Sequence, residues 1–109
     1  MPYTEKQHQQ KVNVFEDITV ELRNLYDAKN RDYGDSFGQS FQKWGLPMSC
    51  IRLGDKLNRL ESFAQKKDMY VSDESVEDTL RDLANYTIMT LVELRMAKKE
   101  TEGEQSCLK

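Results

Sequence analysis

A chain of 109 residues is long enough for one compact domain. Its 38% hydrophobic and 32% charged residues allow only a small core, and such chains often complete their burial by associating, so we expect a homo-oligomer. The formal net charge of −3 argues against a broad surface for duplex nucleic acid, and no apolar run approaches the roughly 20 residues of a membrane span.

The two cysteines, Cys50 and Cys107, are far apart in the sequence and lack the spacing of a metal site. Free thiols are typical of a reducing compartment. Cys107 is third from the end rather than fourth, so it does not form a prenylation motif. Because no signal peptide is visible either, we expect a soluble, cytoplasmic protein.

The first helix is predicted over about residues 4–30, where apolar side chains recur at helical spacing and neither Gly nor Pro interrupts the pattern. These apolar residues are Phe15, Ile18, Leu22, Leu25 and Tyr26. A turn is predicted at residues 32–36, where Gly34 suits a left-handed backbone conformation.

A short helix is predicted over residues 36–44, and the Gly-Leu-Pro sequence at 45–47 ends it. Ser49 is a candidate N-cap for the next helix, which is predicted over about residues 50–66. The predicted core residues of this helix are Leu53, Leu57, Leu60 and Ala64.

The last helix is predicted to run from a cap at Ser72 or Asp73 to about Lys98. Its predicted core residues are Val76, Leu80, Leu83, Ala84, Thr87, Ile88 and Leu91. The polar tail at 99–109 is expected to be disordered. Since no strand pattern or internal repeat is present, the predicted fold is all-α, with three main helices and a short connecting helix in one domain over residues 1–98.

The last helix also carries a polar stripe, because Asp78, Asp82 and Asn85 are spaced i, i+4 and i+7. A like-charge pair at i, i+4 costs roughly 0.2–0.5 kcal/mol in an isolated helix, so a metal ion or a basic side chain is expected to offset it. The alternative is a solvated helix face. Met89 and Val92 continue the same side as apolar residues, which favours a partly covered face.

A second group, Arg52, Asp55, Lys56 and Arg59, lies on the preceding helix. Arginine forks suit the geometry of phosphate groups, so these residues are candidates for a phosphate clamp. The alternative is an exposed ladder of ion pairs, each worth less than ~1 kcal/mol. Gly54 in the middle of this helix costs roughly 1 kcal/mol relative to Ala, and close approach of a helix or ligand explains such a glycine.

A third group, Lys29, Asp32 and Tyr33, lies at the end of the first helix and either closes over a ligand as a lid or forms a well-capped turn. Phe41 and Trp44 either stack on a base or, more commonly at this spacing, belong to the core. The single histidine lies near the start of the chain and is not expected to act as a ligand or base. No Ser-His-Asp, Cys-His, P-loop or dinucleotide-binding motif is present.

Three phrases of the sequence together resemble a phage and bacterial family, the nucleotide-modification-associated domain of the first type. The phrases are YDAKNRDYG at residues 26–34, IRLGDKLNRL at 51–60 and ESVEDTLRDLANY at 74–86. The resemblance covers roughly residues 20–95. The family is regarded as related to the all-α NTP pyrophosphohydrolases, the MazG-like and dimeric dUTPase group, and therefore implies a MazG-like oligomeric helical bundle.

Enzymes of the wider group bind Mg²⁺ through an E-x-x-E pair on one helix and an E-x-x-D pair on the next. The resemblance carries these pairs onto residues 55–58 and 79–82, where Asn58 and Thr79 replace two acidic residues and Lys56 intervenes. It implies Asp55, Asp78 and Asp82 as catalytic and metal-binding residues, with Glu74 as a further ligand.

The function that the resemblance implies is a Mg²⁺-dependent nucleoside-triphosphate pyrophosphohydrolase, cytoplasmic in the host cell if the protein is phage-encoded. The first alternative is a non-catalytic protein that sequesters a nucleotide or a cyclic nucleotide immune signal. The second is a helical assembly factor without a small ligand. The candidate substrate-binding residues are Lys29, Asp32, Tyr33, Arg52, Lys56, Arg59, Asn85 and Tyr86.

Overall fold

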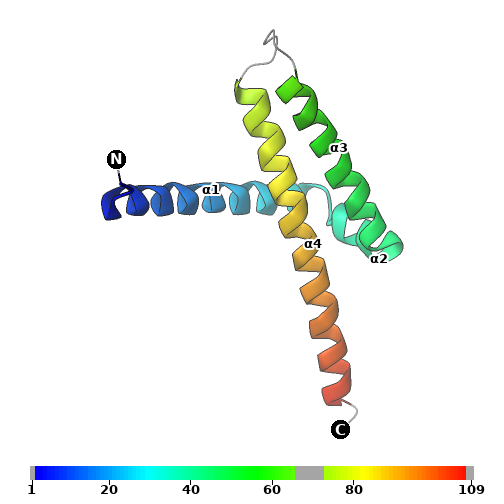
Figure 1. Cartoon of the computed structure of the whole chain (residues 1–109). Coiled ribbons are helices and arrows are strands. Elements are labelled where there is room, and N and C mark those ends of the chain that lie inside the picture. The colour runs from blue at the N-terminus through cyan, green and yellow to red at the C-terminus, as the bar shows by residue number, and fades with distance from the viewer. Residues whose placement is uncertain (1, 66–72, 108–109) are drawn as a thin grey trace. The chain divides into compact units, whose positions relative to one another are not determined.

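Four helices make up the described part of the chain, and no strand occurs in it. The computed structural model describes the backbone of residues 2–65 and 73–107 and the side chains of residues 2–65 and 76–103. The helices are α1 (Glu5–Asp32), α2 (Ser36–Trp44), α3 (Leu46–Gln65) and α4 (Asp73–Cys107), as Figure 1 shows. The prediction of an all-α fold with a short connecting helix is therefore confirmed. None of the described helices combines the length and apolarity that crossing a bilayer requires.

The chain folds as two compact units, Met1–Asp35 and Ser36–Lys109. The first unit is α1 with its terminal turns. Its N-terminus forms a capping box, in which the Gln7 amide donates to the Thr4 hydroxyl at 3.1 Å and the Thr4 amide donates to the Gln7 side chain at 2.8 Å. The predicted turn follows α1, where Gly34 and Asp35 have φ angles of 60° and 59°.

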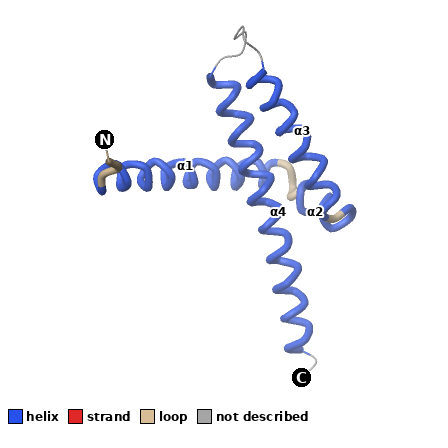
Figure 2. Tube along the Cα trace, in the orientation of Figure 1, coloured by secondary structure: helices blue, strands red, loops and turns tan. Residues whose placement is uncertain are grey.

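The junction between α2 and α3 is a single left-handed residue, Gly45, with φ at +70° (tan in Figure 2). Its amide donates to the Phe41 carbonyl at 2.7 Å and so closes α2. The predicted start of α3 at Cys50, with Ser49 as its cap, is wrong because α3 already begins at Leu46. Proline is well tolerated in a first helical turn, so Pro47 does not break this helix.

Replacing Gly45 with alanine is expected to lower the free energy of unfolding by about 1–2 kcal/mol, the cost of a left-handed L-residue. The new Cβ itself meets only Pro47 Cδ at 3.8 Å, an ordinary contact, so the effect comes from the backbone. Gly103→Ala, inside α4 with no atom within 4 Å of its Cβ, is the control and is expected to stabilise the protein slightly. Urea denaturation measures both, and an unchanged stability for the Gly45 variant contradicts the left-handed junction.

In the second unit, α3 and α4 lie side by side and run in opposite directions (Figures 1 and 2). Two side-chain contacts fix their register: the Ser49 and Thr90 hydroxyls are 2.8 Å apart, and Lys56 Nζ is 2.8 Å from Asp82 Oδ2. Buried and half-buried residues recur around these contacts at spacings of three and four, as in an antiparallel helix pair. We call them the α3–α4 seam: Ser49, Leu53, Lys56, Leu60 and Phe63 of α3, and Thr79, Leu83, Tyr86, Thr90 and Glu93 of α4.

The predicted core of α4 is wrong in part, because Leu80, Ile88 and Leu91 are 45%, 44% and 49% exposed, and Thr87 is also exposed. The seam lies one residue earlier along the helix, and Thr79 and Thr90 are its buried members. Val76, Leu83 and Ala84, also predicted as core, are half-buried. On α3, Leu53 and Leu60 are half-buried as predicted, whereas Leu57 and Ala64 are exposed.

The C-terminal half of α4 projects beyond its contact with α3 (Figure 1). α4 has 35 residues, or about 52 Å at 1.5 Å per residue, whereas the 20 residues of α3 span about 30 Å. The predicted end of this helix at Lys98 is wrong, since α4 continues to Cys107 through the segment expected to be disordered. The continuation contains Glu, Gln and Lys, no proline, and Gly103 as its single glycine, so nothing in it strongly breaks a helix.

Candidate functional site

The α3–α4 seam separates two faces of the helix pair. Residues one position before a seam residue are rotated by about 100° from it. Because the two helices are antiparallel, the same offset turns both sets of side chains toward the same face. We call this the charged face: Arg52, Asp55 and Arg59 of α3, and Asp78, Asp82 and Asn85 of α4. The structure thus assigns most of the predicted phosphate and metal residues to one face of one unit.

Asp82 is bound by the seam residue Lys56, which crosses from α3 with its Nζ 2.8 Å from Asp82 Oδ2. The two side chains are 25% and 36% exposed, so the ion pair is partly shielded from water. A cross-helix pair of this kind contributes more than an exposed surface pair, although its burial is also costly. Lys56 is thereby held at the edge of the charged face.

Asp78 is bound within α4 by Arg81, whose Nη1 lies 2.9 Å from Asp78 Oδ1. The same guanidinium contacts Glu77 Oε2 at 3.2 Å through Nη2. Each carboxylate of the i, i+4 pair therefore has a basic partner, Lys56 for Asp82 and Arg81 for Asp78. The sequence predicted that either a metal ion or a basic side chain offsets the like-charge cost, and in the structure basic side chains do so.

The remaining charged residues of the face are open to solvent. Arg59 lies over the ring of Phe63, with its Cζ 5.6 Å from the ring centroid, and not against Asp55. Among the residues that the structure describes, Arg52 and Asp55 have no ion-pair or hydrogen-bond partner, and both are exposed. The charged face therefore presents two guanidinium groups that no described carboxylate neutralises.

The predicted metal ligands do not gather in the described part of the chain, where no three His, Cys, Asp or Glu side chains are close enough to hold an ion. Asp55 is exposed on α3, and Asp78 and Asp82 have basic partners. The Glu74 side chain lies outside the described residues. The described side chains therefore do not fit a metal centre, and the ligand set of Asp55, Asp78, Asp82 and Glu74 stays a prediction.

The aromatic candidates Tyr86 and Trp44 are not among the charged-face residues. Tyr86 is a seam residue whose ring packs against Phe37 of α2, with centroids 6.0 Å apart. Trp44, at the end of α2, is exposed and carries Lys43 Nζ 5.2 Å from its ring centroid. The third predicted group, Lys29, Asp32 and Tyr33, belongs to the other unit, where Tyr33 is exposed.

Sequence reasoning missed the buried hydroxyl pair that orients the site. Ser49 is completely buried, and Thr90 is 7% exposed. The Thr90 hydroxyl also contacts the Tyr86 carbonyl at 2.7 Å, so it satisfies a polar group of its own helix. The available signal was the recurrence of small hydroxyl residues at helical spacing on α4, Thr79 and Thr90, which hydrophobicity alone does not detect.

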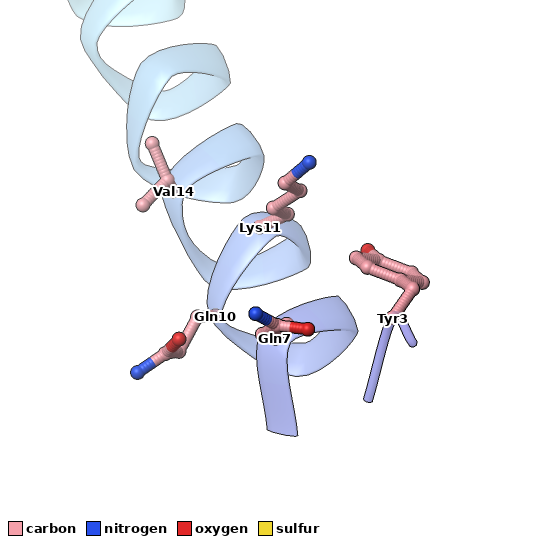
Figure 3. Close-up of a pocket in the computed structure, with 5 residues that line it drawn as sticks. All are labelled: Tyr3, Gln7, Gln10, Lys11 and Val14. Atoms are coloured by element: carbon pink, nitrogen blue, oxygen red, sulfur yellow. The ribbon is translucent and has the colours of Figure 1, made fainter. Parts of the chain in front are cut away.

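One hollow of about 340 Å³ lies at the beginning of α1 (Figure 3). Five exposed residues of this single segment line it: Tyr3, Gln7, Gln10, Lys11 and Val14. Lys11 Nζ lies 5.2 Å from the Tyr3 ring centroid. Because the hollow includes none of the predicted site residues, it does not contribute to the candidate site.

The chain matches the family model described as nucleotide modification associated domain 1 over residues 29–94. No curated protein and no solved structure matches the chain. The matched range begins near the end of α1, includes α2 and α3, and covers α4 as far as Leu94. It therefore contains the whole charged face.

Proposed function

Because the chain belongs to the nucleotide modification associated domain 1 family, we propose that the charged face of α3 and α4 binds the phosphate groups of a nucleotide. The observation that carries this proposal is the pair of exposed guanidinium groups, Arg52 and Arg59, beside carboxylates that already have basic partners. Arginine binds phosphate through two parallel hydrogen bonds, and its charge persists at every physiological pH.

The spacing of the cations supports a ligand with an extended phosphate group. Arg52 and Arg59 are seven residues apart, or about 10.5 Å along the helix axis, and Lys56 lies between them. Two long arginine side chains can converge on one phosphate chain across this interval. Lys56, held by Asp82 at the edge of the face, supplies a third positive charge.

The polar residues of the same face suit the rest of a nucleotide. Asp55 is an exposed carboxylate that accepts hydrogen bonds from a sugar hydroxyl or a base, and Asn85 both donates and accepts. Lys29, Asp32 and Tyr33 belong to the first unit and stay predicted substrate-binding residues.

The proposal is one of binding, to a nucleotide or a cyclic nucleotide. Hydrolysis of a triphosphate with Mg²⁺ requires a gathered set of carboxylates, which the described side chains do not form, and kinship with the MazG-like enzymes stays what the resemblance implies. The pyrophosphohydrolase therefore stays a prediction from resemblance, and its product assay is a separate experiment from the binding test.

The test measures melting temperature and calorimetric binding with mono-, tri- and cyclic nucleotides in the presence of EDTA. A nucleotide at a hundredfold excess over Kd is expected to stabilise the protein by about 2.7 kcal/mol. The double variant Arg52→Ala/Arg59→Ala is expected to weaken binding at least tenfold, because each charge-assisted phosphate contact is worth about 1.5–3 kcal/mol.

The matched control is Arg95→Ala, an exposed arginine of α4 beyond the charged face, which is expected to bind as the wild type does. Absence of a shift with every nucleotide, or equal binding by the double variant and the control, rejects the proposal. Release of monophosphate and pyrophosphate after addition of Mg²⁺ or Mn²⁺ adds catalysis to the binding function.

A further inference from the structure

The second unit has an apolar face opposite its charged face. It consists of the α4 residues one position after the seam: Leu80, Ala84, Thr87, Leu91 and Leu94. Their spacings of four, three, four and three are those of a helix-pairing stripe. Leu80, Leu91 and Leu94 are 45%, 49% and 47% exposed, so α3 leaves this face largely uncovered.

The second unit needs such a face to be covered. Its buried side chains, among those described, are those of the polar residues Ser49, Thr79 and Thr90, and its described large hydrophobic residues are half-buried or exposed. Because burial of apolar area is the main favourable term in folding, covering the outer apolar face adds stability to a helix pair that buries little apolar area of its own.

We propose that the apolar face of α4 pairs with the same face of a second copy of this chain, antiparallel and about a twofold axis near Thr87. A twofold interface must be self-complementary. An axis at Thr87 sets Leu80 level with Leu94 of the second copy, and Ala84 next to Leu91 of the second copy. Along the contact, leucines of one copy therefore face either leucines or the small Ala84 of the other copy.

Thr87 is suited to the axis because its hydroxyl is already satisfied. It donates to the Leu83 carbonyl of the same helix at 2.9 Å, which leaves the methyl group free to face an apolar partner. A threonine in this rotamer therefore does not bring an unsatisfied polar group into the contact.

Charge decides the direction of the pairing. At the N-terminal end of the face Glu77 lies three residues before Leu80, and at the other end Lys98 lies four residues after Leu94, so the two ends of the face carry opposite charges. Antiparallel pairing about Thr87 brings Glu77, ten residues before the axis, within one residue of the level of Lys98 of the second copy, which lies eleven residues after it, twice in each dimer. Parallel pairing instead sets like charges at the same level, which is unfavourable across an interface.

The first experiment measures the mass of the full chain by light scattering and sedimentation. The expected mass is twice the chain mass of 12.8 kDa. Leu91→Glu is expected to raise the dimer dissociation constant at least about 30-fold, as for a central interface residue. Ile51→Glu, an exposed apolar residue of α3 outside the face, is the control and is expected to leave the constant unchanged.

Charge exchange tests the orientation without removing apolar area. Glu77→Lys and Lys98→Glu are each expected to weaken the dimer, and the two together are expected to restore it. Thr87→Cys, in a chain with Cys50 and Cys107 changed to serine, is expected to form an intermolecular disulfide on oxidation, since the two copies of residue 87 meet at the axis.

Each outcome decides the proposal. A dimer, or a larger assembly, that links through Thr87→Cys and weakens with Leu91→Glu supports it. A monomer at every concentration overturns it and leaves the face to another segment of the same chain. An oligomer whose dissociation constant is unchanged by Leu91→Glu, and that forms no disulfide through residue 87, also overturns the proposal, because the copies then meet elsewhere.

Discussion

Replacement of Ser49 with leucine is expected to force α3 and α4 apart and to lower the free energy of unfolding by about 3 kcal/mol. Ser49 is completely buried at the point where its hydroxyl meets that of Thr90 at 2.8 Å. No space exists there for three further carbon atoms, and the change also removes a hydrogen bond inside the seam. Both helices must move to relieve the overlap.

The neighbouring residue provides a matched control. Cys50 is exposed, so Cys50→Leu adds a similar side chain to the same turn of α3 and is expected to change stability by less than about 0.5 kcal/mol. Ser49→Ala removes only the hydroxyl and is expected to cost about 1 kcal/mol. Urea denaturation at one fixed protein concentration compares the three, and equal stability of both leucine variants rules out the seam at this residue.

The helices themselves were predictable because their signals are local. Gly45 ends α2 through its own φ angle, and the long α1 follows from an uninterrupted helical pattern and a capping box at Thr4. These signals act within a few residues of the chain. The error at the start of α3 is also local. The sequence pattern around Pro47 predicted a break, but proline is compatible with a first helical turn.

The face that α4 turns toward α3 could not be predicted from hydrophobicity. Two stripes of equal periodicity run along this helix, one through Thr79 and Thr90 and one through Leu80 and Leu91. They differ by one residue, and the apolar stripe is the stronger signal. The choice between them is made by contacts between residues 41 positions apart in the chain, Ser49 and Thr90, and no local pattern encodes such a pairing.

In the candidate site, too, local helical spacing predicted some features, whereas the long-range pairing of α3 and α4 decided others. Helical spacing correctly grouped Asp78 with Asp82 and predicted that a cation offsets their repulsion, and it placed Met89 and Val92 on a partly covered side, where both are half-buried. The identity of the partner of Asp82 depends on the register of two helices, because Lys56 is 26 positions away. Tyr86 was a ligand candidate by resemblance, and the register makes it a seam residue beside Phe37.

The polar contacts of the α3–α4 seam have a functional role, because they determine how the two faces of the helix pair are arranged. The polar contacts between α3 and α4, Ser49 with Thr90 and Lys56 with Asp82, fix the register of the two helices more specifically than the leucines of the seam do, since each polar group requires its own partner. That register sets the interval between Arg59 and the acidic residues of α4. The apolar face lies on the opposite side, so the proposed pairing of two copies leaves the charged face open.

The Lys56–Asp82 pair is expected to show a coupling free energy of about 1 kcal/mol in a double-mutant cycle. Asp82→Asn and Lys56→Met are each expected to cost about 1–2 kcal/mol, because each leaves a partly shielded charge without its partner. The double variant Lys56→Met/Asp82→Asn closes the cycle and is expected to cost about 1 kcal/mol less than the two single variants together, since neither side chain then carries a charge without a partner. Asp55→Asn, at an exposed residue, is the control for stability.

The same variants separate two roles of Asp82. If Asp82 serves to hold Lys56, then Asp82→Asn lowers stability but still binds nucleotide in EDTA, because the positive charges of the face remain. If Asp82 instead acts through a metal ion, binding in EDTA is weak in the wild type and rises on addition of Mg²⁺, and the asparagine variant loses this rise. A Mg²⁺-dependent gain in affinity that Asp82→Asn abolishes therefore contradicts the assignment of Lys56 as the cation that Asp82 requires.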